Sequence, residues 1–249
     1  MSGGGEGPAA TPQTHLMIGE PIGVAARIRT LAELHAHPLA VLDIDLTLVD
    51  TGPRTRAVMA EWCMAAGLET EARRAHDVPL EFSIVANFVR IGVPAERVAE
   101  AMAHWREAFF RPAMLAHDEA LPGAVDAVCA LAAAGATIVY LTARPVALAA
   151  ATLERFRALG FPIGGPGVLL VTKDVPLERD EAYKRRALTW LARVGVAALC
   201  ADNEPAMANA MHEAFPSALT VHVATRHSHP APALLPGIRQ VPRLMDVLP

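Results

Sequence analysis

Two aspartates, Asp43 and Asp45, directly follow an apolar run in the segment "AVLDIDLTLVD". In an extended chain, side chains two residues apart point to the same side, so both carboxylates are expected at one surface. Two unit charges about 4 Å apart repel by about 4 kcal/mol at an effective dielectric of 20. A fold that keeps both groups ionised therefore needs a cation or a shared proton beside them. The segment predicts a binding or catalytic site.

Other polar residues end later apolar runs: Thr142 in "IVYLT", Lys173 in "LLVTK" and Asp202 in "ALCAD". These runs alternate with segments of helical period, a pattern typical of a parallel sheet covered by helices on both faces. In such sheets ligands bind outside the carboxyl ends of the strands. We therefore expect these three side chains to converge with Asp43 and Asp45. The sequence holds neither a GxGxxG nor a GxxxxGK loop, so dinucleotide and P-loop chemistry are not indicated.

The order of these patterns predicts an α/β fold: a doubly wound, Rossmann-like parallel sheet with an inserted helical cap. Residues 21–50 and 112–249 would form the core. Residues 51–111 carry apolar residues at helical spacing without a convincing strand, and would form the cap. Residues 1–20 are rich in Gly, Pro and Thr and are expected to be disordered. The Pro-rich stretch 226–249 is expected to wrap the surface.

Composition narrows the class of partner. The chain has 249 residues, a formal net charge of −4 and scattered basic residues, which leaves no electrostatic footprint for nucleic acid or an anionic membrane. Asp126 and Gly135 interrupt its most apolar long window, so no membrane span is expected. The cysteines at 63, 129 and 200 form no CxxC pair, and the N-terminus lacks the pattern of a secretory signal. We expect a cytoplasmic protein that binds a small molecule, and leave a homodimer open.

Four segments together resemble the motifs of the haloacid dehalogenase-like (HAD) superfamily. "VLDIDLTLVD" resembles its DxDxT strand end, and "IVYLTARP" looks like its strand ending in Thr. "YKRRAL" is similar to its lysine early in a helix, and "LCADNEP" is similar to its strand ending in an acidic cluster. The four occur in the right order over residues 40–208. The resemblance implies a Rossmann-like core and makes the insert a C1-type cap.

The resemblance also implies roles for individual residues. Asp43 would be the nucleophile that forms an aspartyl-phosphate, and Asp45 the general acid and base. Thr142 and Lys184 would hold the phosphoryl oxygens. A Mg²⁺ ion would be bound by Asp43, Asp202 and the backbone carbonyl of Asp45. Lys184 is favoured over Lys173 as the phosphate-binding lysine because a helix follows it, although Lys173 lies at a strand end.

The predicted function is a Mg²⁺-dependent phosphatase that hydrolyses a small phosphomonoester, a phosphorylated metabolite. Asp45 favours this over a dehalogenase, because a departing halide needs no proton. A phosphomutase uses the same two acids and stays an alternative. A receiver-type signalling domain would be about half as long and lack a cap. A non-catalytic ligand-binding protein is also kept, because the fourth motif reads Asp202-Asn203-Glu204. Position 46 is Leu where Gly is frequent, which points to a different conformation of the adjoining flap.

The cap and the C-terminal stretch hold polar and aromatic residues with weaker signals. Arginines 54 and 56 follow the first motif and could steer an anion, but we expect them to be solvated. The aromatic residues of the insert could line a lid, but we expect them to form the core of the cap. Two histidines of the last stretch are expected at the surface rather than on a metal. The aromatic residues of the insert are Trp62, Phe82 and Phe88, and the two histidines are His227 and His229.

Overall fold

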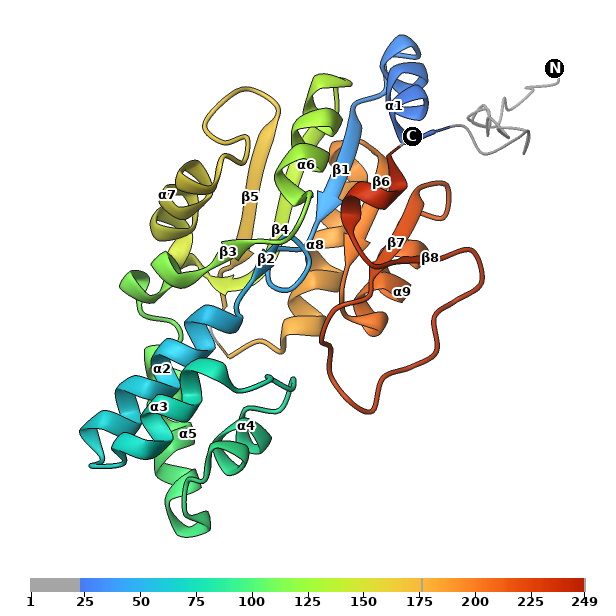
Figure 1. Ribbon diagram of the computed structural model, residues 1–249. Helices are drawn as coiled ribbons and strands as arrows, with labels where there is room; N and C mark the ends of the chain where they lie inside the picture. The colour runs from blue at the N-terminus through green and yellow to red at the C-terminus, as the bar shows by residue number, and fades with distance from the viewer. Residues whose placement is uncertain (1–22, 176, 249) are drawn as a thin grey trace, which may run out of the picture.

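The computed structural model describes residues 23–175 and 177–248 (Figure 1). The tail predicted over residues 1–20 lies outside the described residues.

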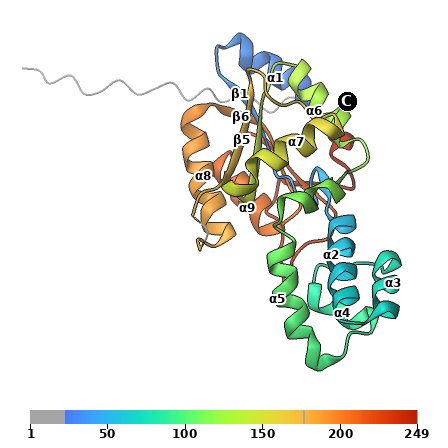
Figure 2. The same ribbon diagram turned by 90° about the vertical axis from the view of Figure 1, so that its left-hand side faces the viewer.

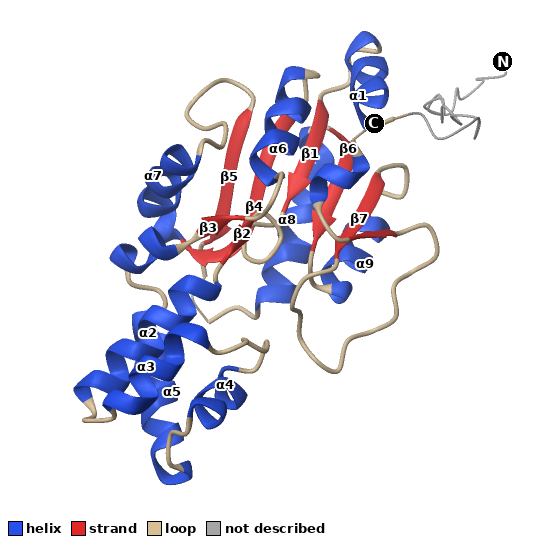
Figure 3. Ribbon diagram, in the orientation of Figure 1, coloured by secondary structure: helices blue, strands red, loops and turns tan. Residues whose placement is uncertain are grey.

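A six-stranded parallel sheet forms the centre of the molecule, with the order β5-β4-β1-β6-β7-β8 (Figure 3). Its strands are β1 (Pro38–Leu42), β4 (Thr137–Pro145), β5 (Val168–Lys173), β6 (Val196–Asp202), β7 (Leu219–Val223) and β8 (Arg239–Val241). Numbered among themselves, they run 3-2-1-4-5-6, the order of doubly wound nucleotide-binding folds. The winding reverses between β1 and β6, so a crevice is expected beyond the carboxyl ends of these two strands. The predicted fold class is confirmed.

The strand β8 was not foreseen. The C-terminal stretch was expected only to wrap the surface, but three of its residues pair in parallel with β7. The strand is short and lies at the edge of the sheet, where two of its three residues are exposed. Such a strand has too few buried positions to leave an apolar run in the sequence.

Helices cover both faces of the sheet (Figure 2). Alternate residues of β1 face opposite ways: Ala40 and Leu42 belong to one apolar cluster, and Leu39 and Val41 belong to the other. The first cluster includes residues of α1 (Val24–Glu33), α6 (Ala124–Ala133) and α7 (Ala149–Leu159). The second includes residues of α8 (Asp180–Val194) and α9 (Pro205–Ala214). Burial on both faces explains why the strands read as continuous apolar runs.

The cap is a group of helices with a core of its own, beyond the carboxyl ends of the strands (Figure 1). Its helices are α2 (Gly52–Ala65), α3 (Glu69–Asp77), α4 (Ile84–Ile91) and α5 (Val98–Ala108). The rings of Trp62 and Phe88 meet edge to face in this core with centroids 5.7 Å apart. The chain leaves and re-enters the core through two short antiparallel strands, β2 (Val49–Asp50) and β3 (Glu119–Ala120).

Short 3-10 segments complete the fold at Ala95–Arg97, Pro112–His117, Val146–Leu148 and Leu244–Val247. Within the described part of the chain, no helix has the length and apolar character needed to cross a membrane.

Candidate active site

The neighbouring strands β1 and β6 bring Asp43 and Asp202 together beyond their carboxyl ends, and α8 adds Lys184 between them. The Lys184 ammonium donates to Oδ1 of Asp43 and to Oδ2 of Asp202, both at 2.7 Å. All three side chains are buried. Three residues far apart in the sequence thus form one compact ionic group.

This group has one cation for two carboxylates. Burial and, after it, repulsion from Asp202 raise the pKa of Asp43 to about 7, although the Lys184 ammonium opposes the shift. Burial likewise raises the pKa of Asp202 against the attraction of Lys184. With both acids ionised the trio carries a net charge of −1, so a further cation at the free carboxylate lone pairs would stabilise the ionised state.

The turn after β1 is held to the end of β6 by Thr47. Its hydroxyl donates to Oδ2 of Asp43 at 2.9 Å and accepts from the backbone N–H of Asn203 at 3.0 Å. Within this turn Leu46 has a φ of 63°, the left-handed conformation that Gly adopts more easily. The Leu46 carbonyl accepts a 2.5 Å hydrogen bond from the Thr225 hydroxyl, which fixes the turn from the other side. Leucine therefore keeps the geometry expected of Gly at a cost of about 1–2 kcal/mol.

Two buried arginines hold the Asp45 carboxylate. Arg144 donates from Nη2 to Oδ1 at 2.6 Å and from Nε to Oδ2 at 3.0 Å, and Arg54 donates from Nη2 to Oδ1 at 2.9 Å. Behind them, Asp118 lies 2.9 Å from Nε of Arg54 and 2.7 Å from Nη2 of Arg144. The four formal charges cancel. We call Asp45, Arg54, Arg144 and Asp118 the arginine clamp.

The expectation that Arg54 would be solvated is wrong. Its side chain is 0% exposed, and its guanidinium lies 3.8 Å from the centroid of the Phe109 ring in addition to its two acidic contacts. The first turn of α2 directs it back to the sheet edge, which no local sequence pattern reveals. Arg56, two residues later, donates to the carbonyl of Val78 within the cap.

Sequence reasoning also missed Arg144 and Asp118. Arg144 lies two residues after Thr142 in "LTARP", and this spacing at a strand end was the available signal. Asp118 comes just before β3, where the chain returns from the cap, and nothing in its sequence surroundings marks it. Its role depends on two arginines that are 64 and 26 residues away.

The clamp sets the ionisation of Asp45. Burial by itself would raise the pKa of this carboxyl, but the charges of Arg144 and then Arg54 outweigh it and hold the pKa well below its usual range. Burial raises the pKa of Asp118, with the same arginines opposing the shift. Asp45 is thus a carboxylate at neutral pH.

The other predicted residues divide clearly between the site and its surroundings. Thr142 is buried and lines the same cavity as Asp43 and Lys184, and its Oγ1 accepts from the backbone N–H of Arg144 at 3.2 Å. Lys173 instead donates to Oδ1 of Asp180 at 2.7 Å. Of the two candidate lysines, the structure places Lys184 beside the acids.

The donor set suits Mg²⁺. Asp43 and Asp202 offer hard carboxylate oxygens, and Mg²⁺ is commonly held by one or two carboxylates together with water and substrate oxygens. The Glu204 carboxylate accepts from the backbone N–H and hydroxyl of Ser228. The Asn203 amide donates to the carbonyl of Arg226. Across residues 23–175 and 177–248 no group of three His, Cys, Asp or Glu side chains is arranged to hold a metal.

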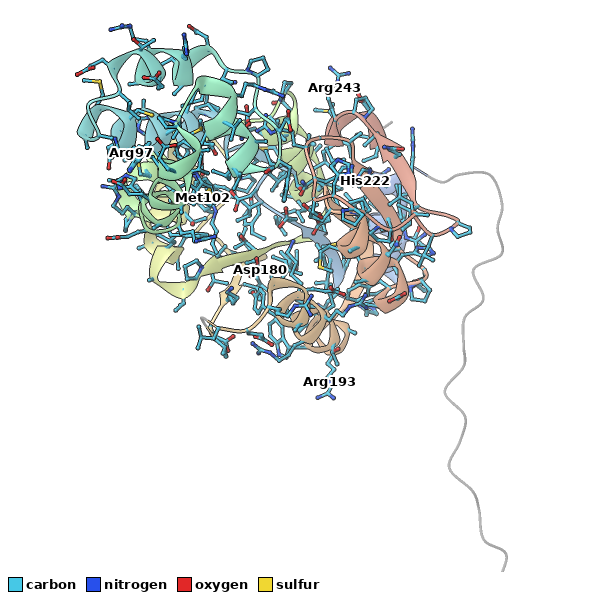
Figure 4. The ribbon with its side chains drawn as sticks, turned by 90° about the horizontal axis from the view of Figure 1, so that it is seen from below. Arg97, Met102, Asp180, Arg193, His222 and Arg243 are labelled. Atoms are coloured by element: carbon cyan, nitrogen blue, oxygen red, sulfur yellow. The ribbon has the colours of Figure 1, made fainter. Side chains whose placement is uncertain are left out.

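A cavity of about 610 Å³ lies between the cap and the core at this site. Figure 4 shows the molecule from below, with Asp180 labelled on α8 of the core and Met102 labelled on α5 of the cap. Its volume is in the range typical of small-molecule sites. The lining from the core includes Asp43, Asp45, Thr142, Arg144, Lys184 and Asn203. The lining from the cap includes Leu80, Phe82, Ile84, Trp105, Phe109 and Phe110.

Comparison with solved structures finds proteins of similar fold. A protein of Clostridium difficile described as a candidate phosphatase aligns with 86% of this chain and 99% of its own, at 13% identity and a TM-score of 0.55. CbbY from Rhodobacter sphaeroides, solved with phosphate, aligns with 85% of this chain and 96% of its own, at 18% identity and a TM-score of 0.49. A haloacid dehalogenase-like hydrolase of Streptococcus pneumoniae aligns over 87% and 92%, at 13% identity and a TM-score of 0.46.

No protein-family model and no curated protein sequence matches the chain. The likeness to the Clostridium difficile protein shows a shared fold.

Proposed function

We propose that the protein is a Mg²⁺-dependent phosphatase that hydrolyses a small phosphomonoester through an aspartyl-phosphate on Asp43. The observation that carries this proposal is the pairing of two different carboxylates in one cavity. Asp43 shares a cation with Asp202, whereas Asp45 is held ionised by two arginines. Two carboxylates whose surroundings differ have different proton affinities, so they can take different roles. Here Asp43 would be the nucleophile and Asp45 the proton carrier.

In the first half-reaction, a carboxylate oxygen of Asp43 would attack phosphorus while the P–O bond to the alcohol breaks. Lys184 would place its charge against a phosphoryl oxygen, and the Thr142 hydroxyl would donate to another. Bound Mg²⁺, held by Asp43, Asp202 and the backbone carbonyl of Asp45, would supply positive charge to the phosphoryl group and favour ionised Asp43.

Asp45 would handle the proton in both half-reactions. A phosphoryl dianion close by raises the proton affinity of a carboxylate, so substrate binding opposes the effect of the arginines. Asp45 would then take up a proton from solvent when the substrate binds and give that proton to the departing alkoxide. In the second half-reaction the carboxylate would take a proton from the water that attacks the aspartyl-phosphate. Arg54 and Arg144 would keep it oriented throughout.

Release of inorganic phosphate from sugar, nucleotide and small organic phosphates, with and without Mg²⁺, tests the proposal. The Asp43→Asn variant is the catalytic control, and Asp77→Asn at the exposed end of α3 is the matched surface control. Metal-dependent release that is lost in Asp43→Asn and kept in Asp77→Asn is expected. Isomerised product without free phosphate would indicate a phosphomutase. Ligand binding without turnover would indicate a non-catalytic binding protein.

A further inference from the structure

The cavity described above has two chemically different ends. At the core end lie the ionic groups around Asp43 and Asp45. At the cap end the lining is mostly apolar and comes from the segment 80–84 and the end of α5. Here Trp105 stacks on Phe109 with ring centroids 4.4 Å apart, and Phe110 meets Phe109 edge to face at 5.3 Å. These aromatic rings adjoin the arginine clamp, because the Arg54 guanidinium lies over the Phe109 ring.

Two rings of this end are open to a ligand. Phe82 and Phe110 each remain 43% exposed although both line the cavity. Large aromatic side chains gain most from burial, and they pack well against a second flat ring. A substrate whose leaving group covers these two rings would therefore gain affinity from that leaving group.

The charges that line the cavity disfavour a second anionic group. Its basic lining residues are Arg144, Lys184 and Arg226. The first two are committed to the acids described above, and Arg226 lies 2.9 Å from Oδ1 of Asp50. Four further acids line the cavity: Glu81, Asp180, Glu181 and Glu204. Among the described residues, then, no cation of the lining stays unpaired for a second phosphate or a carboxylate.

We propose that the cavity selects phosphomonoesters with a single phosphoryl group and an uncharged, ring-bearing leaving group that contacts Phe82 and Phe110. The inference rests on the proposed phosphatase function and specifies its substrate class. The same lining disfavours sugar bisphosphates, because their second phosphate would find only cations that are already paired with acids, and further acids beside them.

The test compares substrates whose leaving groups are all simple primary alcohols, so that leaving-group chemistry stays constant. These are 2-phenylethyl phosphate, propyl phosphate and glycerol 1-phosphate, with propane-1,3-diol bisphosphate, whose two phosphates are also on primary carbons, as the doubly charged probe. We expect kcat/KM for 2-phenylethyl phosphate to exceed that for propyl phosphate by about tenfold or more, mainly through KM. Phe82→Ala and Phe110→Ala should each reduce this ratio severalfold. Val89→Ala, an exposed apolar residue of α4 outside the cavity lining, should leave it unchanged.

The outcomes separate this inference from the function on which it rests. Turnover of all four probes at similar kcat/KM, or a preference for the bisphosphate, would overturn the substrate class while the phosphatase function stands. A preference for the phenylethyl ester that persists in both Phe variants would also overturn it. If no phosphomonoester is hydrolysed with Mg²⁺ present, the proposed function itself fails.

Discussion

Arg144 donates a hydrogen bond to each carboxylate oxygen of Asp45, from Nη2 to Oδ1 at 2.6 Å and from Nε to Oδ2 at 3.0 Å. This bidentate geometry fixes the plane of the carboxylate as well as its position. Arg54 approaches Oδ1 from the cap side, at 2.9 Å. Three hydrogen bonds therefore orient the acid that the proposed chemistry needs to move a proton.

Replacing Asp45 with Asn should separate substrates by their leaving groups. Asn can neither give nor take the proton, so turnover of alkyl phosphates should fall by about 10²–10⁴-fold. Activated aryl phosphates, whose leaving groups need little protonation, should lose much less. Steady-state kinetics on one ester of each kind measures the difference. Equal losses on both would argue against Asp45 as the acid.

Replacing Asp118 with Ala should destabilise the fold. The change leaves Arg54 and Arg144 buried with only Asp45 to balance them, and breaking a buried ion pair costs about 3–5 kcal/mol. Urea unfolding should show this loss in the free energy of unfolding. Asp77→Ala, which removes an exposed acid without a described ion pair, should change it by no more than about 0.5 kcal/mol. Comparable stabilities of the two variants would mean that the clamp is not structurally important.

The two candidate lysines give opposite expectations for phosphate mimics. Lys184→Ala should weaken inhibition by vanadate by about tenfold or more, because a charge-assisted contact to an anion is lost. Lys173→Ala removes a lysine that pairs with Asp180 and should leave the inhibition constant nearly unchanged. Circular dichroism would confirm that both variants are folded. A large effect in Lys173→Ala alone would mean that the wrong lysine has been assigned.

Mg²⁺ should stabilise the folded protein independently of catalysis. A ligand that binds only the native state at about 100 times its Kd adds about 2.7 kcal/mol, so Tm should rise when Mg²⁺ replaces EDTA. Asp202→Asn should abolish most of the rise, since it removes one of the two carboxylates. Asp77→Asn should retain it. An identical rise in the Asp202 variant would place the metal elsewhere.

How far the sequence predicts this structure depends on the range of each interaction. Buried parallel strands leave apolar runs, so β1, β4 and β6 were predictable, and with them the convergence of Asp43, Thr142 and Asp202. The arginine clamp was not predictable. Arg54 lies at the start of a helical segment, where an arginine is expected to be exposed, and only the folded structure brings it to Asp45. The edge strand β8 was missed because only one of its three residues is buried, which is too few to show an alternating pattern of apolar residues in the sequence.

The most direct test of the central claim is to trap the phosphoryl group on the enzyme. Under single-turnover conditions, rapid acid quenching should capture an acyl phosphate, and borohydride reduction followed by peptide mass spectrometry should place it at residue 43. We predict that this species forms before free phosphate appears, decays as phosphate accumulates and is missing in Asp43→Asn. Phosphate release at the normal rate with no covalent species at any time, or with the label on another residue, would contradict the account.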